Sequence, residues 1–130
     1  MNLLDKVNYW VELAEYDLET AKVMLKSKRL LYVGFMCHQT IEKITKGYFE
    51  KYKCTSAPYT HNISKISKEA GLYDSFTDEQ LDLIDLLDPM NVGTRYPQDK
   101  AKLEKSLTEE KCKKILKETE VLLEWIKNKL

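Results

Sequence analysis

The sequence predicts an all-α fold, an up-and-down helical bundle of about five helices. Four Gly and three Pro are few among 130 residues, whereas an all-β chain needs a turn about every 8 to 12 residues. The apolar residues recur at alternating steps of three and four, which is the spacing along one face of an α-helix. The length suits one core, so we expect residues 1–130 to form a single helical domain.

The first predicted helix, from about Asn2 to Lys26, has the most regular apolar pattern in the chain. Its seam toward the rest of the bundle is Leu4, Val7, Val11, Ala14, Leu18, Ala21 and Leu25. Residues 27–29 break the pattern, and a second helix from about Leu30 to Lys53 continues it. Because the break is short, the two helices should form a hairpin.

The second helix has more apolar surface than one neighbouring helix can cover. Phe35, Phe49 and Tyr52 lie outside its seam. We therefore expect a homodimer that buries some of these side chains. The alternative is that residues 89–99 and the short helices cover this surface within one chain.

Two short helices are predicted in the middle of the chain. One runs from Ile63 to Ala70, and Gly71 follows in the left-handed position that commonly ends a helix. The other opens with a capping box, in which Thr77 is followed three residues later by Gln80, and it stops before Pro89.

Residues 89–99 have no apolar period and predict the one long connection of the domain. Long connections in small domains often carry function. A last helix from about Thr108 to Lys129 follows, with Glu109 and Glu110 in its first turn, where acidic residues are favoured.

The charge balance excludes binding to DNA or to an anionic membrane through a global field, because 21 basic residues face 21 acidic ones. Any nucleic-acid site must be local. No apolar run reaches the roughly 18 residues of a membrane span, and the N-terminus lacks the basic and apolar segments of a leader. We expect a cytoplasmic protein without a membrane partner.

The sequence offers no motif for a metal, a cofactor or a nucleophile. Cys37, Cys54 and Cys112 lack the spacing of zinc ligands and are interpreted as buried thiols. The glycines do not form a phosphate-binding loop, and no serine sits in a nucleophile elbow. Cys37 and His38 are neighbours on a helix and point about 100° apart, which disfavours a catalytic pair. We predict no catalytic residue, no metal and no cofactor.

The second helix contains a dense row of polar residues. Gln39, Glu42, Lys43 and Lys46 are spaced by three and four residues and lie on adjoining faces. One interpretation is a solvated stripe with internal ion pairs. The other places Glu42, Lys43 and Lys46 in a binding site. Asp17 in the first helix could pair with a lysine of this row.

Arg95 is the main candidate binding residue. It is one of two arginines and lies in the long connection beside Tyr96. In one interpretation its guanidinium clamps the end of a helix or a carboxylate such as Glu42 or Asp17, and so holds the connection on the bundle.

In the other interpretation, Arg95 faces a groove with Lys43, Lys46 and His61 and binds a phosphate, while Tyr96 stacks on a base. His61 itself precedes a short helix, and this position indicates capping or anchoring of the loop.

Five short motifs occur in order along the chain. They are AEYDLETA at 14–21, QTIEKITK at 39–46, THNI at 60–63, TRYP at 94–97 and LEWI at 123–126, with Tyr9-Trp10 before the first. Over nearly the whole chain these motifs resemble the HEPN family of small helical bundles. The family's usual forms are A-x-x-D-L-x-x-A, Q-A-x-E-K-A-x-K, T-H-D-L and A-R-Y-P.

The resemblance implies a dimeric helical bundle, often encoded beside a minimal nucleotidyltransferase, with roles in nucleotide or RNA binding and in toxin-antitoxin pairs. Many HEPN members are metal-independent ribonucleases that use an Arg followed, four to six residues later, by a His on a late helix. Arg95 has no such partner here, because no His follows His61.

The function predicted from these observations is a non-catalytic HEPN subunit that homodimerises and pairs with a minimal nucleotidyltransferase. Nucleotide or RNA would bind near Arg95, Tyr96, His61, Lys43 and Lys46. The alternative is a metal-independent ribonuclease, a toxin, in which Arg95 and His61 meet only in the fold.

Overall fold

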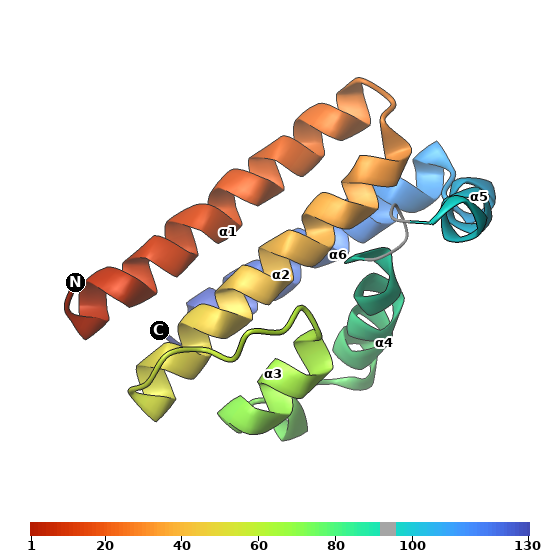
Figure 1. Ribbon diagram of the computed structural model, residues 1–130. Coiled ribbons are helices and arrows are strands. Elements are labelled where there is room, and N and C mark those ends of the chain that lie inside the picture. The colour runs from red at the N-terminus through yellow and green to blue at the C-terminus, as the bar shows by residue number, and fades with distance from the viewer. Residues whose placement is uncertain (92–95) are drawn as a thin grey trace.

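The computed structural model describes residues 1–91 and 96–130, which form helices joined by turns and loops (Figure 1). The α-helices are α1 (Leu3–Lys26), α2 (Leu30–Lys53), α3 (Ile63–Ala70), α4 (Asp78–Leu87), α5 (Pro97–Ser106) and α6 (Glu109–Lys127). Two 3₁₀ helices, η1 (Tyr73–Ser75) and η2 (Asp88–Asn91), lie before and after α4. The predicted all-α bundle is confirmed, although the described residues contain six α-helices rather than about five.

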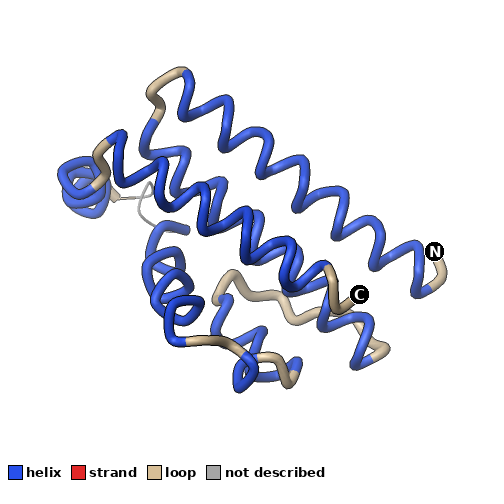
Figure 2. Tube along the Cα trace, turned by 180° about the vertical axis from the view of Figure 1, so that it is seen from behind, coloured by secondary structure: helices blue, strands red, loops and turns tan. Residues whose placement is uncertain are grey.

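The long helices form one side of the molecule. α1 and α2 are an antiparallel hairpin, and α6 packs against both of them (Figures 1 and 2). α3, α4 and η2 pack on another side of α2. α5 lies at the end of the bundle that holds the α1–α2 turn, and the two termini lie close together at the opposite end.

The seam predicted for α1 faces the core. Its buried members are Val7, Ala14, Leu18 and Ala21, and Val11 and Leu25 are partly buried. Leu4 is exposed, contrary to the prediction, because it lies in the first turn at the end of the bundle. The matching core positions of α2 and α6 include Val33, Ile41, Ile44, Ile115, Leu122 and Ile126.

α2 is the central helix and contacts α1, α3, α4, α5, α6 and η2. Of the side chains beyond its seam, Phe49 is buried, Phe35 is half-buried and Tyr52 is exposed. The short helices pack on α2, but Tyr52 stays exposed, so neither the dimer nor the single-chain alternative is decided by this burial. The homodimer remains a prediction.

The helix-end signals read from the sequence are present. Gly71 ends α3 with a φ of 77°, a left-handed conformation that costs glycine no steric strain. Thr77 and Gln80 make both hydrogen bonds of a capping box at the start of α4. The Thr108 side chain accepts a hydrogen bond from the Lys111 backbone N–H at the start of α6.

The prediction of one irregular connection over residues 89–99 is wrong at both of its ends. η2 extends to Asn91, and α5 begins at Pro97. α5 has no apolar period because none of its residues is buried. Its helical form follows from local signals instead, namely Pro97 at the first position and Asp99 in the first turn. Residues 92–95, including Arg95, lie outside the described residues.

The cysteines are unpaired thiols, and two of the three are buried as expected. Cys54 is exposed, contrary to the prediction, because it follows the last turn of α2 in a left-handed conformation (φ 55°). In the part of the chain that the structure describes, no helix is both long and apolar enough to cross a membrane.

Candidate functional site

The polar row on α2 lies largely inside the molecule, so its interpretation as solvated is wrong, although the expected internal ion pair is present between Glu42 and Lys46. Glu42 is 3% exposed and Lys46 is 8% exposed, while Lys43 and Gln39 are half-buried. A buried charge is costly unless it is paired and hydrogen-bonded. The contacts of these side chains therefore decide what the row does.

Glu42 is the centre of the cluster, because each oxygen of its carboxylate has a cationic or polar partner. Oε2 accepts a hydrogen bond from Lys46 Nζ at 3.1 Å, and Oε1 accepts one from His61 Nδ1 at 2.9 Å. Both partners lie near the same carboxylate because Lys46 is one turn further along α2 and His61 precedes α3. The 60–63 motif thus contacts the 39–46 motif.

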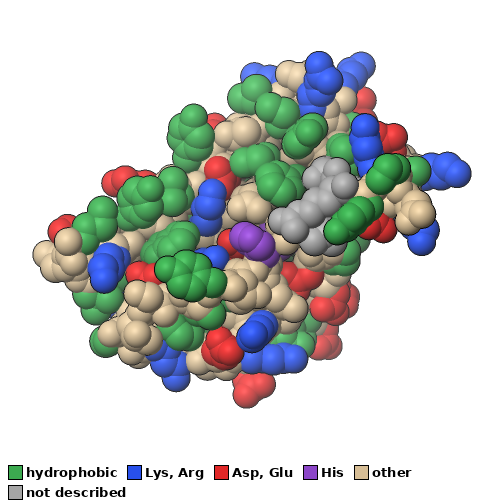
Figure 3. All heavy atoms as spheres, in the orientation of Figure 1, with side chains coloured by type: hydrophobic (Ala, Val, Ile, Leu, Met, Phe, Trp, Pro, Cys, Tyr) green, Lys and Arg blue, Asp and Glu red, His purple; other side chains and the backbone are tan. Residues whose placement is uncertain are grey.

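His61 is the accessible member of this cluster, with 53% of its side chain exposed. Since a carboxylate accepts, Nδ1 must donate to Glu42, which leaves Nε2 as the ring nitrogen available to a ligand. No hydrogen bond from Nε2 to the described residues is present. In Figure 3 the visible histidine surface lies over the middle of α2, near both basic and acidic side chains.

His38 holds the backbone at His61, which agrees with the prediction that the loop is anchored at this residue. Its ring is fully buried, and Nε2 donates to the carbonyl oxygen of His61 at 2.9 Å. In the neutral ring, Nδ1 is then an acceptor, and it has no hydrogen-bond partner within the described residues. Glu42 Oε1 is 3.8 Å from this nitrogen. His61 is thus fixed through its ring and through its backbone.

Asp88 completes the junction between α2, α3 and η2. It accepts hydrogen bonds from the Ile63 backbone N–H at 2.8 Å and from Ser64 Oγ at 3.0 Å, and it lies 3.7 Å from His38 Nε2. Burial acts to raise the pKa of Asp88, but the nearby His38 ring and the hydrogen bonds from Ile63 and Ser64 together hold this pKa below its usual value. The carboxylate therefore supports the start of α3 in its charged form.

Lys43 points to the other side of the row and pairs with Asp17 of α1, which confirms the predicted contact between the two helices. Lys46 Nζ also lies 5.7 Å from the centre of the Trp10 ring. Trp10 comes close to α2 at Gly47, where an added Cβ would lie 3.1 Å from Trp10 Cβ. The two lysines are therefore paired inside the chain and are not free cations.

The remaining sequence candidates are not brought into this cluster by the described contacts. Tyr96 is 62% exposed and precedes α5. Arg95 lies outside the described residues. Among residues 1–91 and 96–130, no group of His, Cys, Asp and Glu side chains is arranged to hold a metal ion.

Sequence reasoning missed His38, Asp88 and Trp10. For His38 a signal was present, because it precedes Glu42 by four residues and so lies on the same face of the helix. Asp88 and Trp10 carry no such local signal, since their partners are far away in the sequence.

The fold and the site define a class of protein, a small all-α bundle whose central helix carries a buried carboxylate, lysine and histidine cluster. The HEPN domain family matches residues 7–129, and the chain belongs to this family. The crystal structure of TT1696 from Thermus thermophilus has the same fold, with a TM-score of 0.82, 20% sequence identity and 100% of both chains covered. No curated protein matches the chain.

Proposed function

We propose that this HEPN-domain protein is a cytoplasmic, single-domain binding subunit that homodimerises and pairs with a minimal nucleotidyltransferase in a toxin-antitoxin-like system. It binds a nucleotide or RNA beside His61. Binding is favoured over cleavage because no His follows Arg95 at the four to six residue spacing of the ribonuclease members.

The observation that carries this proposal is the rigid presentation of a half-exposed imidazole. His61 is held by Glu42 through its ring and by His38 through its carbonyl group. Taking charges such as Glu42 and Lys46 out of water costs several kcal/mol per ion, about as much as the pairing returns. An arrangement that adds little stability but fixes one accessible ring nitrogen is typical of a binding site.

The charge pairing sets which residues can contact a phosphate. Lys46 is engaged by Glu42, and Lys43 by Asp17, so neither lysine is a free cation. His61 Nε2 remains available, and it donates to a phosphate oxygen when the ring carries both protons. Arg95 and Tyr96 are proposed, from the sequence alone, to supply a second phosphate contact and a stacking ring.

Binding is tested by fluorescence anisotropy with a labelled adenine nucleotide and a labelled single-stranded RNA. His61→Ala should weaken binding by about 10-fold or more, the effect of a hydrogen bond to a charged group worth about 1.5–3 kcal/mol. Lys53→Ala is the control, because Lys53 is exposed at the far end of α2. Equal affinities for the two variants would contradict the proposed site.

Pairing is tested separately. The proposal expects a minimal nucleotidyltransferase gene beside this one, and the two products should elute together in size-exclusion chromatography at a mass that contains two copies of this chain. Independent elution of the two proteins would contradict the pairing.

A second candidate function is metal-independent RNA cleavage, which the Glu42–His61 contact favours. A carboxylate that holds one ring nitrogen and leaves the other facing outward is the arrangement of a general acid-base histidine. Cleavage in the presence of a chelator that is lost in both His61→Ala and Arg95→Ala would select this function. Binding without cleavage would select the first.

A further inference from the structure

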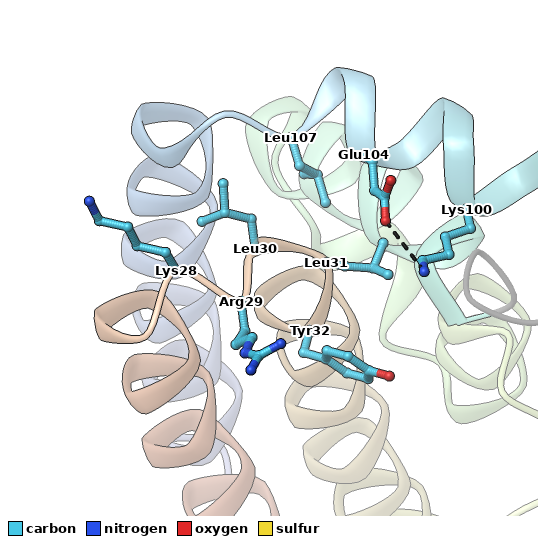
Figure 4. Close-up of a pocket in the computed structure, with 8 residues that line it drawn as sticks. All are labelled: Lys28, Arg29, Leu30, Leu31, Tyr32, Lys100, Glu104 and Leu107. Carbon is cyan, nitrogen blue, oxygen red and sulfur yellow. Dashed lines mark ion pairs between the residues drawn. The ribbon is translucent and has the colours of Figure 1, made fainter.

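We infer that a pocket between the start of α2 and α5 binds an acidic, partly apolar peptide segment of a protein partner. The pocket has a volume of about 340 Å³ and lies at the end of the bundle that holds the α1–α2 turn (Figure 4). It is separate from the cluster at Glu42, which lies 12 residues further along α2 than Leu30, or about 18 Å along the helix.

The charges of the pocket select an anionic partner. Its lining includes three cationic residues, Lys28, Arg29 and Lys100, and one carboxylate, Glu104. Lys100 and Glu104 pair at 3.6 Å, with both side chains about half exposed, so the pair holds the lysine weakly. Lys28 and Arg29 have no ion pair with any described residue. In a chain with no net charge, this is a local excess of positive charge.

The apolar part of the lining selects a peptide over a bare phosphate. Leu30, Leu31 and Leu107 line the pocket together with Tyr32, which is exposed. Figure 4 shows Leu31 of α2 and the Lys100–Glu104 pair of α5 facing one another, while Leu107 and Leu30 lie nearer the α1–α2 turn. A phosphate would make no apolar contact with these leucines. A peptide with an aliphatic side chain beside an Asp or Glu can contact both the leucines and the cationic residues of the pocket.

Arg29 and Tyr32 are of the residue types that contribute most to protein–protein binding. Both lie on the α2 side of the pocket in Figure 4, while Lys28 points outward at its edge. A nucleic acid is disfavoured because it needs phosphate contacts along an extended basic surface, and the balanced charge of the chain provides no field to attract one. The lining therefore fits a short segment of a protein.

The α1–α2 turn keeps a cation at a position where the backbone favours glycine. Lys28 has a φ of 57°, in the left-handed region that is strained for residues with a Cβ. Lys28 places its charge at the edge of the pocket in spite of this strain, which is consistent with a role for the charge in binding.

The inference rests on the proposed function only in assuming that the subunit has a protein partner. A peptide bound in this pocket does not cover His61, so the subunit can bind a peptide in the pocket and a nucleotide at His61 at the same time.

The test uses the full chain and three fluorescein-labelled probes, measured by anisotropy at low salt. One is a short peptide of Asp, Glu and Leu, the second has Lys in place of the acidic residues, and the third is a single-stranded RNA. The wild-type protein should bind the acidic peptide, and Arg29→Glu should weaken this binding by about 10-fold or more, because like charges then meet.

Two further variants show whether a loss of binding comes from the pocket or from a folding defect. Lys28→Gly removes a charge and relieves the left-handed backbone, so it folds at least as well and should still weaken binding of the acidic peptide. Lys53→Glu reverses an exposed charge at the other end of α2 and should leave the affinity within about twofold of the wild type.

The inference is overturned if the acidic peptide does not bind, if the basic peptide binds equally well, or if Arg29→Glu behaves like Lys53→Glu. RNA binding that Arg29→Glu abolishes, without peptide binding, would assign the pocket to nucleic acid instead. Nucleotide binding at His61 is measured on the same proteins. A wild-type protein that binds the acidic peptide but no nucleotide would count against the proposed function alone, and one that binds the nucleotide but no acidic peptide would count against the pocket alone.

Discussion

Removing the carboxylate of Glu42 tests the central claim about the site, that its charges are buried and mutually dependent. In Glu42→Ala, Lys46 keeps its charge at 8% exposure but loses the carboxylate 3.1 Å away, and His61 loses the acceptor of its Nδ1 proton. Breaking a buried pair from one side costs about 3–5 kcal/mol. We expect the lower end, about 3 kcal/mol, because the flexible lysine stem can carry the ammonium toward water.

The assay is urea unfolding followed by circular dichroism, with the loss read as a lower midpoint at an unchanged slope. The double variant Glu42→Leu/Lys46→Met removes both charges at once, and it should lie within about 1 kcal/mol of the wild type, because apolar residues can replace a buried pair. A loss below about 1 kcal/mol in Glu42→Ala is what an exposed pair would give, and it would refute the burial argument.

Three further predictions concern the core, the junction at Asp88 and the thiols. Leu18→Ala should cost about 2–5 kcal/mol because this side chain is buried, while the exposed Leu4→Ala should stay within about 0.5 kcal/mol; equal losses would contradict the α1 seam. Because the pKa of Asp88 is lowered in the fold, its stabilisation is complete above the ordinary carboxyl pKa and is lost as the pH falls through the lowered value. The unfolding free energies of the wild type and Asp88→Asn should therefore converge between about pH 5 and about pH 2, and a constant difference would argue against this role. Burial raises the pKa of Cys37 to about 12 and also raises that of Cys112, so Cys54 alone should react rapidly with a thiol reagent in the native protein at neutral pH. A second fast thiol would show that the core opens more readily than its packing indicates.

Local signals explain which parts of the fold could be predicted. The seam of α1, the capping box at Thr77 and the left-handed Gly71 each depend on residues within one or two turns, and each is present. The sequence pattern does not predict α5 because none of its residues is fully buried, so the apolar period that indicates the other helices is absent there.

The site was harder to predict because burial of a polar row depends on distant residues. Glu42 and Lys46 have the spacing of a solvated stripe, and what covers them, His61 and Trp10, lies 19 and 36 residues away from Glu42 and Lys46 respectively. From the sequence, His38 is considered only as a possible catalytic partner of Cys37, whereas in the fold it contacts the carbonyl group of His61 and lies near the carboxylate of Asp88. The sequence names candidate chemical groups, but the environment of each group depends on the fold.

The junction around Asp88 also determines how the molecule can open. α1, α2 and α6 are joined along long apolar seams, whereas α3 is a short helix that adds Ile63 and Ile66 to the core, and its start depends also on the Asp88 carboxylate and on the bond from His38 to the His61 carbonyl oxygen. Elements attached through a few polar contacts open locally at lower free energy than the core. We therefore expect the amides of Ile63 and Ser64 to be less protected from hydrogen exchange than those in the middle of α2, with protection factors that fall further in acid. Such an opening would release the backbone at His61 while the long helices stay folded.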